Sequence, residues 1–206
     1  DKDSLFVAIN GYNTDGHNFI HEAINNGAST VICEVLPKDF KKLKSVFVKV
    51  TCSKSALSII SSNFYDNPSS KIDLIGITGT NGKTTISSLL FDLFNRFSIN
   101  SGLISTINIK YGDQDIDSTN TTPDSKSINY HLAEMIKSNV KICFMEVSSH
   151  GIDQKRIEGL FFKGVIFTNL THDHIDYHKS FANYRDTKKK IFDSLTNSSF
   201  SLINSD

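Results

Sequence analysis

The residues with the clearest chemical potential form one short run: Gly79, Thr80, Asn81, Gly82, Lys83, Thr84 and Thr85. An apolar segment, 74–78, precedes the run, and apolar residues recur at three- and four-residue spacing over 86–97 after it. Strand, glycine loop and helix in this order hold nucleotide phosphates, because loop N–H groups and the positive end of the helix dipole face the anion. Lys83 would reach the terminal phosphates and Thr84 would bind Mg²⁺. We therefore predict that this run binds a nucleoside triphosphate.

The spacing of the glycines departs from the general phosphate-loop pattern. That pattern has a glycine five residues before the Gly-Lys pair, where this chain has Ile77. The alternative is an ordinary glycine turn ahead of a helix capped by Thr84. The apolar strand before the loop and the periodic helix after it favour the phosphate site.

Two further polar clusters follow predicted strands. Glu146 ends the apolar segment 141–147 and is a candidate Mg²⁺ ligand, because hard cations prefer carboxylate oxygens. A carboxylate capping the next helix is the alternative. His172, His174 and His178 suggest zinc, but their spacing matches no standard zinc site and no cysteine is nearby. A solvated polar loop, or one histidine assisting at the Mg²⁺ site, fits better.

The composition indicates an ordinary globular protein. The 206 residues carry no net charge, which gives nucleic-acid binding no electrostatic support, and 38% of them are hydrophobic. No apolar run approaches the ~20 residues of a membrane span. The three cysteines, Cys33, Cys52 and Cys143, are scattered without a paired spacing. We expect a reduced, cytoplasmic protein with no nucleic-acid or membrane partner.

Strand-like and helix-like segments alternate along the chain, which predicts an α/β fold. Residues 66–70 are rich in turn formers and divide a small N-terminal α/β domain, 1–70, from a phosphate-loop mononucleotide-binding domain with a mostly parallel sheet, 71–206. In the first domain we predict strands at 5–9, 30–33 and 46–50, and helices at 19–24, 37–44 and 56–64. In the second we predict strands at 74–78, 102–107, 141–147, 165–168 and 200–203, a hairpin-like stretch near 111–113, and helices at 86–97, 128–136 and 181–195.

Four stretches together resemble the Mur ligases, specifically the MurE-type ligases that add the third peptide residue. They are 78–85, 120–123, 145–156 and 167–178, and a further match runs from 3 to 17. Folylpolyglutamate synthetases share the glycine loop, so that loop indicates only the superfamily. The runs Asn120-Thr121-Thr122-Pro123 and Glu146-Val147-Ser148-Ser149-His150-Gly151 are much more specific to the third-residue ligases.

The resemblance implies roles for individual residues. Lys83 would contact the β- and γ-phosphates, Thr84 and Glu146 would hold a first Mg²⁺, and His174 would serve a second. Positions matching the muramoyl-peptide site are Asn120, Thr121, Thr122, Ser148, Gln154 and Arg156. Positions matching the uridine site are Tyr12, Asn13 and Thr14.

Lys188 matches the position at which Mur ligases carry a carbamylated lysine, a catalytic residue and metal ligand. It begins the run Lys188-Lys189-Lys190, and the alternative, non-catalytic interpretation of such a run is a solvated basic helix face. Lys189 and Lys190 point about 100° and 200° away from Lys188 on a helix, so we expect only those two to be solvated.

The implied reaction is ATP-dependent amide ligation in peptidoglycan precursor synthesis. ATP would phosphorylate UDP-MurNAc-L-Ala-D-Glu, and meso-diaminopimelate or L-lysine would displace phosphate from the acyl phosphate. The sequence does not distinguish these two amino acids. The family pattern extends before Asp1 and beyond Asp206, so we expect this chain to be part of a longer enzyme and to be inactive alone. The resemblance also implies that the enzyme is a monomer. Two alternatives stay open: a nucleotide- or UDP-sugar-binding module without turnover, and a folylpolyglutamate-type ligase.

Overall fold

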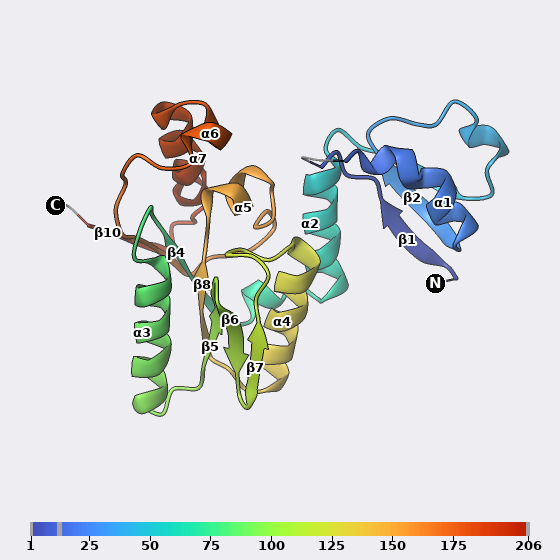
Figure 1. Cartoon of the computed structure of the whole chain (residues 1–206). Coiled ribbons are helices and arrows are strands. Elements are labelled where there is room, and N and C mark those ends of the chain that lie inside the picture. Colours follow the sequence, from blue (N-terminus) through green and yellow to red (C-terminus); the bar gives the residue numbers. More distant parts are fainter. Residues whose placement is uncertain (1, 12–13, 205–206) are drawn as a thin grey trace. The chain divides into compact units, whose positions relative to one another are not determined.

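The computed structural model describes residues 2–11 and 14–204 (Figure 1). Its contacts separate two compact units, Asp1–Ile60 and Ser61–Asp206, a division that falls earlier than the boundary predicted after residue 70. Residues 68 and 69 of the predicted linker are buried in the second unit. Within the described ranges, no helix is both long and apolar enough to cross a membrane.

The first unit is built on a parallel sheet with the strand order β1-β2-β3. Its strands are β1 (Ser4–Val7), β2 (Ala28–Cys33) and β3 (Val46–Lys49). Its helices are η1 (Gly16–Phe19), α1 (Ile20–Asn25) and η2 (Phe40–Lys42), and α2 (Ser53–Phe64) runs into the second unit. Ala8, Ile20, Val31 and Cys33 form the buried core. The predicted helix over 37–44 is wrong in extent, because only one 3₁₀ turn forms there.

The second unit contains a sheet with the order β10-β9-β4-β8-β5-β6-β7. The first five strands in this order are parallel, and β6 and β7 form an antiparallel hairpin at one edge. The strands are β4 (Asp73–Thr78), β5 (Ser101–Ile104), β6 (Asn108–Tyr111), β7 (Gln114–Asp117), β8 (Ile142–Glu146), β9 (Gly164–Phe167) and β10 (Phe200–Ile203). The prediction of an α/β fold with a mostly parallel sheet and a hairpin near 111–113 is confirmed.

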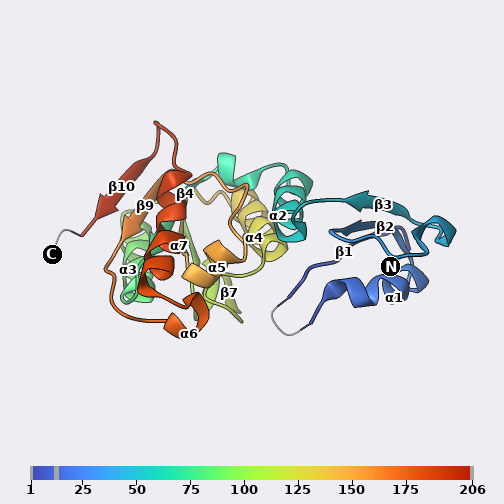
Figure 2. The ribbon, with the colours of Figure 1, turned by 90° about the horizontal axis from the view of Figure 1, so that it is seen from above.

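Helices cover both faces of this sheet, viewed from above in Figure 2. The helices that begin in this unit are η3 (Pro68–Ser70), α3 (Lys83–Arg96), α4 (Ser125–Lys137), α5 (Ser149–Asp153), α6 (Ile175–His178) and α7 (Phe181–Asp193). Helix α3 packs its apolar stripe on Ile75, Ile77, Leu103 and Phe144. The opposite face holds a larger core to which α4 and α7 contribute Ile128, Leu132, Met135 and Ile191. The alternation of side chains along each strand separates the two cores.

The predicted strand 102–107 is wrong at its end. Strand β5 stops at Ile104, and β6 begins at Asn108. Ser105 turns the chain between them, because its hydroxyl donates to the Asn108 carbonyl oxygen at 2.8 Å. The turn brings the backbone N–H of Thr106 to the Glu146 carboxylate at 2.8 Å. This turn therefore places Thr106 beside the end of β8.

Candidate functional site

The loop between β4 and α3 lies at the end of the sheet where β8 leads into α5 (Figure 1). Both of its glycines have positive φ, 148° at Gly79 and 83° at Gly82. A Cβ on Gly79 would lie 2.0 Å from the Thr168 hydroxyl oxygen, so a larger residue does not fit there. Gly82 caps α3 without a side-chain hydrogen bond. The first-turn N–H groups of α3 are thus left without a capping side chain, and such a helix start attracts anions.

Thr168 and Asn169, directly after β9, hold this loop in place, and neither is among the site residues predicted from the sequence. Asn169 accepts from the backbone N–H groups of Thr80, through its carbonyl at 2.9 Å, and of Asn81, through its side chain at 3.0 Å. The Thr168 hydroxyl donates to the Asn81 carbonyl at 2.6 Å. Both residues directly follow a buried strand and lie in the stretch 167–178 that resembles the Mur ligases, which are the signals that the sequence offered.

Lys83 begins α3 and is half-buried. Its Nζ donates to the carbonyl oxygens of Gly79 at 3.0 Å and Thr80 at 2.8 Å. Burial lowers the pKa of this amine, and the carboxylates of Glu146 and Asp173 oppose the shift. The two carbonyl oxygens therefore hold the ammonium group at the loop. A bound phosphate would take their place as its partner and would carry a full negative charge.

Thr84, in the first turn of α3, meets Glu146 at the carboxyl end of β8. The Thr84 hydroxyl donates to Glu146 Oε2 at 3.0 Å, and Thr106 donates its own hydroxyl to the same oxygen at 3.1 Å. Glu146 is fully buried. A carboxylate and a hydroxyl this close are the oxygen donors that Mg²⁺ takes alongside water and phosphate, so this pair fits the cation. The alternative role of Glu146 as a cap on the next helix is not seen, since Ser148 caps α5.

Lys188 is buried on α7, with 3% of its surface exposed, whereas Lys189 and Lys190 are exposed. The interpretation of this run as a uniformly solvated face is therefore wrong for Lys188. Its Nζ donates to the Gly79 carbonyl at 2.8 Å. Burial, followed by repulsion from Lys83, lowers the pKa of Lys188 to about 7, against a weaker opposing effect of Asp173.

Thr78 presents a buried hydroxyl that has no hydrogen-bond partner among the described residues. Side chains alternate along β4, so Thr78 faces the same side as Gly76, where a Cβ would contact Ile191 of α7 at 3.2 Å. Lys188 lies one helical turn before Ile191. The unpaired hydroxyl thus faces the turn of α7 that carries Lys188.

Of the three predicted histidines, His174 and His178 both pack on the His150 ring, with centroid distances of 4.9 and 5.7 Å. His174 is exposed, in the left-handed region at φ 52°, and its ring lies 3.5 Å from the Asp173 carboxylate. His172 packs on Phe181, and His178 is buried with its Nε2 2.9 Å from the Ser149 hydroxyl. Among residues 2–11 and 14–204, no group of three or more His, Cys, Asp or Glu side chains could hold a metal ion. The geometry gives the zinc alternative no support.

A second cluster gathers four of the six residues predicted to hold the muramoyl peptide. Arg156 donates to the Thr122 carbonyl at 2.5 Å and through Nη2 to the Gln154 side-chain oxygen at 2.8 Å. Thr122 and Ser148 hydroxyls are 3.1 Å apart, and the Ser148 N–H donates to Thr122 Oγ1 at 2.9 Å. Burial lowers the pKa of Arg156. The guanidinium is therefore fixed in one orientation.

The remaining predicted site residues lie outside these two clusters. Asn120 is exposed and its Nδ2 donates to the Thr119 hydroxyl at 3.3 Å, and Thr121 beside it is half-buried. Thr14 is exposed in the first unit, where its carbonyl accepts from the Gly11 N–H at 3.0 Å. Tyr12 and Asn13 lie outside the described residues.

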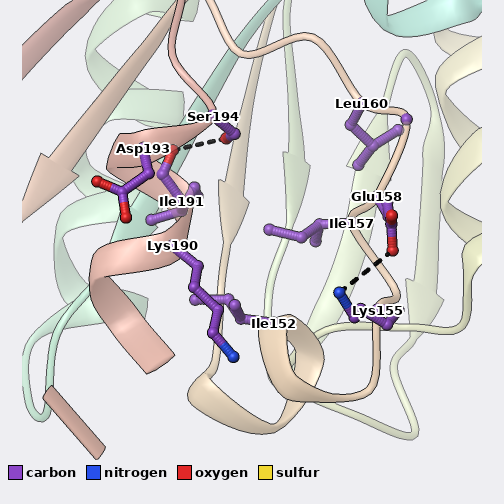
Figure 3. A pocket seen from close by; sticks show the side chains of 10 residues that line it. Ile152, Lys155, Ile157, Glu158, Leu160, Lys190, Ile191, Asp193 and Ser194 are labelled. Carbon is purple, nitrogen blue, oxygen red and sulfur yellow. Dashed lines mark hydrogen bonds and ion pairs between the residues drawn. The ribbon is translucent and has the colours of Figure 1, made fainter. Parts of the chain in front are cut away.

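A cavity of about 370 Å³ lies between α7 and the segment that runs from the end of α5 (Figure 3). Its apolar wall includes Ile152, Ile157 and Ile191. At its rim Lys155 pairs with Glu158 at 3.6 Å. None of the predicted site residues lines it.

The parallel sheet, the glycine loop and the adjacent hydroxyl–carboxylate pair define a phosphate-loop nucleotide-binding protein of the α/β class. The Mur ligase middle domain matches residues 77–206, and the Mur ligase family catalytic domain matches residues 1–65. The chain belongs to the Mur ligase family.

Individual relatives are similar along the whole chain. The UDP-N-acetylmuramoyl-L-alanyl-D-glutamate–2,6-diaminopimelate ligase of Cytophaga hutchinsonii is 50% identical over 206 residues, covering 100% of this chain and 42% of that protein. The ligase of the same name from Bacteroides fragilis is 48% identical, covering 98% and 41%. A solved structure of a ligase with this name has a TM-score of 0.78 at 25% identity, covering 100% and 41%. This chain thus spans about two fifths of the length of these relatives.

Proposed function

We propose that the protein to which this chain belongs is an ATP-dependent ligase that joins 2,6-diaminopimelate to UDP-MurNAc-L-Ala-D-Glu. The observation that carries the proposal is that two clusters lie at the same end of the sheet. One, around the glycine loop, suits Mg²⁺-ATP, and the other is built around Arg156. The names of relatives 50% and 48% identical over this chain supply the amino acid, which the sequence alone left open between diaminopimelate and L-lysine. The product would serve peptidoglycan precursor synthesis in the cytoplasm.

The phosphate-loop cluster, which consists of the glycine loop with Lys83, Thr84, Glu146 and Lys188, would activate the substrate carboxylate. Lys83 would leave the Gly79 and Thr80 carbonyls and neutralise charge on the phosphate that is transferred. Thr84 and Glu146 would hold Mg²⁺, and His174 would serve a second ion. When bound, Mg²⁺ offsets the repulsion between the ATP phosphates and the attacking carboxylate. Phosphorylation converts a poor electrophile into an acyl phosphate that an amine can attack.

The Arg156 cluster would hold the muramoyl peptide. The planar fork of an arginine matches a carboxylate or a pyrophosphate, and the contacts to Gln154 and Thr122 fix its plane before the ligand arrives. Ser148 and Thr122 offer hydroxyls beside it, while Asn120 and Thr121 would close the site from the exposed loop. In the first unit Tyr12, Asn13 and Thr14 would hold the uridine.

Carbamylation of Lys188 fits the surroundings of its amine. A pKa of about 7 leaves about half of the amines neutral at pH 7, and only the neutral amine attacks CO₂. The new N–C bond forms as the amine loses a proton to water, which gives a carbamate anion with two oxygens. The Thr78 hydroxyl, unpaired within the described residues, is a donor on the same side of the sheet. A carbamate would also remove the repulsion between Lys188 and Lys83.

The test is a ligation assay on the full-length protein with mass-spectrometric detection. Incubation with ATP, Mg²⁺, UDP-MurNAc-L-Ala-D-Glu and diaminopimelate should give the UDP-MurNAc-tripeptide. Parallel reactions with L-lysine, and with tetrahydrofolate and glutamate, should give little product. Product only in the folate reaction would favour the folylpolyglutamate-type alternative, and substrate binding without any product would favour a binding module.

A further inference from the structure

Tyr184 of α7 connects the parts of the phosphate-loop cluster, although no pattern in the sequence marks it. It is the largest fully buried side chain in the described structure. Its hydroxyl lies 3.1 Å from the Thr80 hydroxyl, and the Lys188 amine lies 4.9 Å from the centre of its ring. The ring also packs edge-on to His174, with centroids 6.1 Å apart. One buried side chain thus touches the loop, the buried lysine and the exposed histidine.

Counting donors and acceptors assigns a direction to the hydrogen bond. Thr80 Oγ1 accepts from the Thr171 N–H at 2.9 Å, and its own hydrogen can reach the Thr171 carbonyl at 3.3 Å. A hydroxyl has one hydrogen and two lone pairs, so one lone pair of Thr80 is left to accept the Tyr184 O–H. With Tyr184 as donor, the hydroxyls of Tyr184 and Thr80 each have a hydrogen-bond partner.

Thr80 is in turn the hub of the loop. Its N–H donates to the Asn169 carbonyl at 2.9 Å, and its carbonyl holds Lys83 Nζ at 2.8 Å. Thr80 also hydrogen-bonds to Thr171, which directly precedes the histidine loop, 172–174. Displacing the Thr80 side chain would therefore loosen both the anchor of Lys83 and the start of the histidine loop.

We propose that Tyr184 is a positioning residue for ATP. By donating its hydroxyl hydrogen to Thr80, Tyr184 fixes the conformation of the phosphate loop. This inference rests on the proposed function only in taking ATP as the ligand of the loop. Tyr184 itself is too deeply buried to touch substrate and acts through Thr80. Its ring, which packs against Lys188 and His174, is a separate contribution that a phenylalanine would keep.

The experiment uses the full-length protein with Tyr184→Phe, Thr80→Val and the double variant. Losing the hydroxyl should raise the KM for ATP about three- to tenfold, the range expected for one lost hydrogen bond. The KM for UDP-MurNAc-L-Ala-D-Glu should stay within twofold of wild type. In the Thr80→Val background, Tyr184→Phe should change the KM for ATP by less than twofold, because its acceptor is already gone.

Tyr111→Phe is the matched control, since Tyr111 is also buried and its hydroxyl lies 3.4 Å from a His131 ring nitrogen. It should leave the KM for ATP unchanged, and thermal melts should show all variants folded. An unchanged KM for ATP in Tyr184→Phe, or effects of the two single changes that multiply in the double variant, would overturn the proposal. Failure of the proposed function looks different, because the wild-type protein would then form no tripeptide.

Discussion

The two polar clusters at the edge of the second unit's sheet are built on opposite principles. In the Arg156 cluster, the cation is held by a carbonyl and an amide oxygen, and each hydroxyl has a partner. In the phosphate-loop cluster, two cations, Lys83 and Lys188, share the carbonyl of Gly79 and repel each other.

This difference indicates a division of labour. A cluster whose groups already satisfy each other presents a fixed shape, so its loss should weaken binding more than turnover. A cluster whose two cations repel each other would be completed by an added phosphate, so its loss should reduce turnover.

The largest effect is expected for Lys83→Ala. Removing the ammonium group from the transferred phosphate should reduce ligation by about 10³-fold, the upper range for one transition-state donor. Binding of UDP-MurNAc-L-Ala-D-Glu, measured by calorimetry, should persist. Exposed Lys189 provides the control variant, Lys189→Ala. Ligation within threefold of wild type in Lys83→Ala would refute the phosphate-loop assignment.

Lys188→Ala should lower ligation by about 10²-fold, because the proposed carbamate at this position could no longer form. Lys189→Ala and Lys190→Ala remove exposed neighbours and should have no effect. Added acetate should restore part of the Lys188→Ala activity by supplying a carboxylate. Equal losses in all three variants would mean that the lysine run acts only as a charged surface.

Arg156→Lys should affect binding more than turnover. Lysine keeps the charge but cannot make the planar, two-pronged contact, so the KM for UDP-MurNAc-L-Ala-D-Glu should rise about tenfold while kcat changes little. Lys155→Ala, at a neighbouring cation paired with Glu158, is the control. A fall in kcat with an unchanged KM would contradict the division of labour between the clusters.

A smaller, pH-dependent effect follows from the lowered pKa of Lys188. The folded state favours the neutral amine above pH 7, so carbamylation should be fast there and slow about tenfold for each pH unit below it. Protein depleted of CO₂ would be returned to a fixed CO₂ concentration at several pH values. The recovery rate of ligation should follow this profile, and a recovery rate that climbs steadily up to pH 10 would show an ordinary lysine.

The sequence was sufficient where structure depends on neighbouring residues. The strand, loop and helix around Gly79 to Thr84 are contiguous, and the alternation of apolar segments led to the parallel sheet. The difference between Lys188 and Lys189 followed from helical geometry once the resemblance had singled out Lys188. Short elements escaped prediction, including α5 and α6, because four or five residues carry too little periodicity.

Contacts between distant residues could not be predicted from local patterns. The Tyr184 hydroxyl meets Thr80 across 104 positions, and Thr106 reaches Glu146 across 40. Both depend on how β5, β8 and α7 are placed around β4. A tyrosine in a polar helix gives no sign that its side chain is fully buried.

The central claim is that the substrate carboxylate is activated by phosphate from ATP at this sheet edge. The most direct measurement uses UDP-MurNAc-L-Ala-D-Glu with ¹⁸O in both oxygens of its terminal carboxylate, and the full-length protein with ATP and diaminopimelate. Passage through an acyl phosphate transfers one ¹⁸O to inorganic phosphate for each amide bond formed, and mass spectrometry should show this one-to-one ratio. Tripeptide formation with unlabelled phosphate would contradict the account.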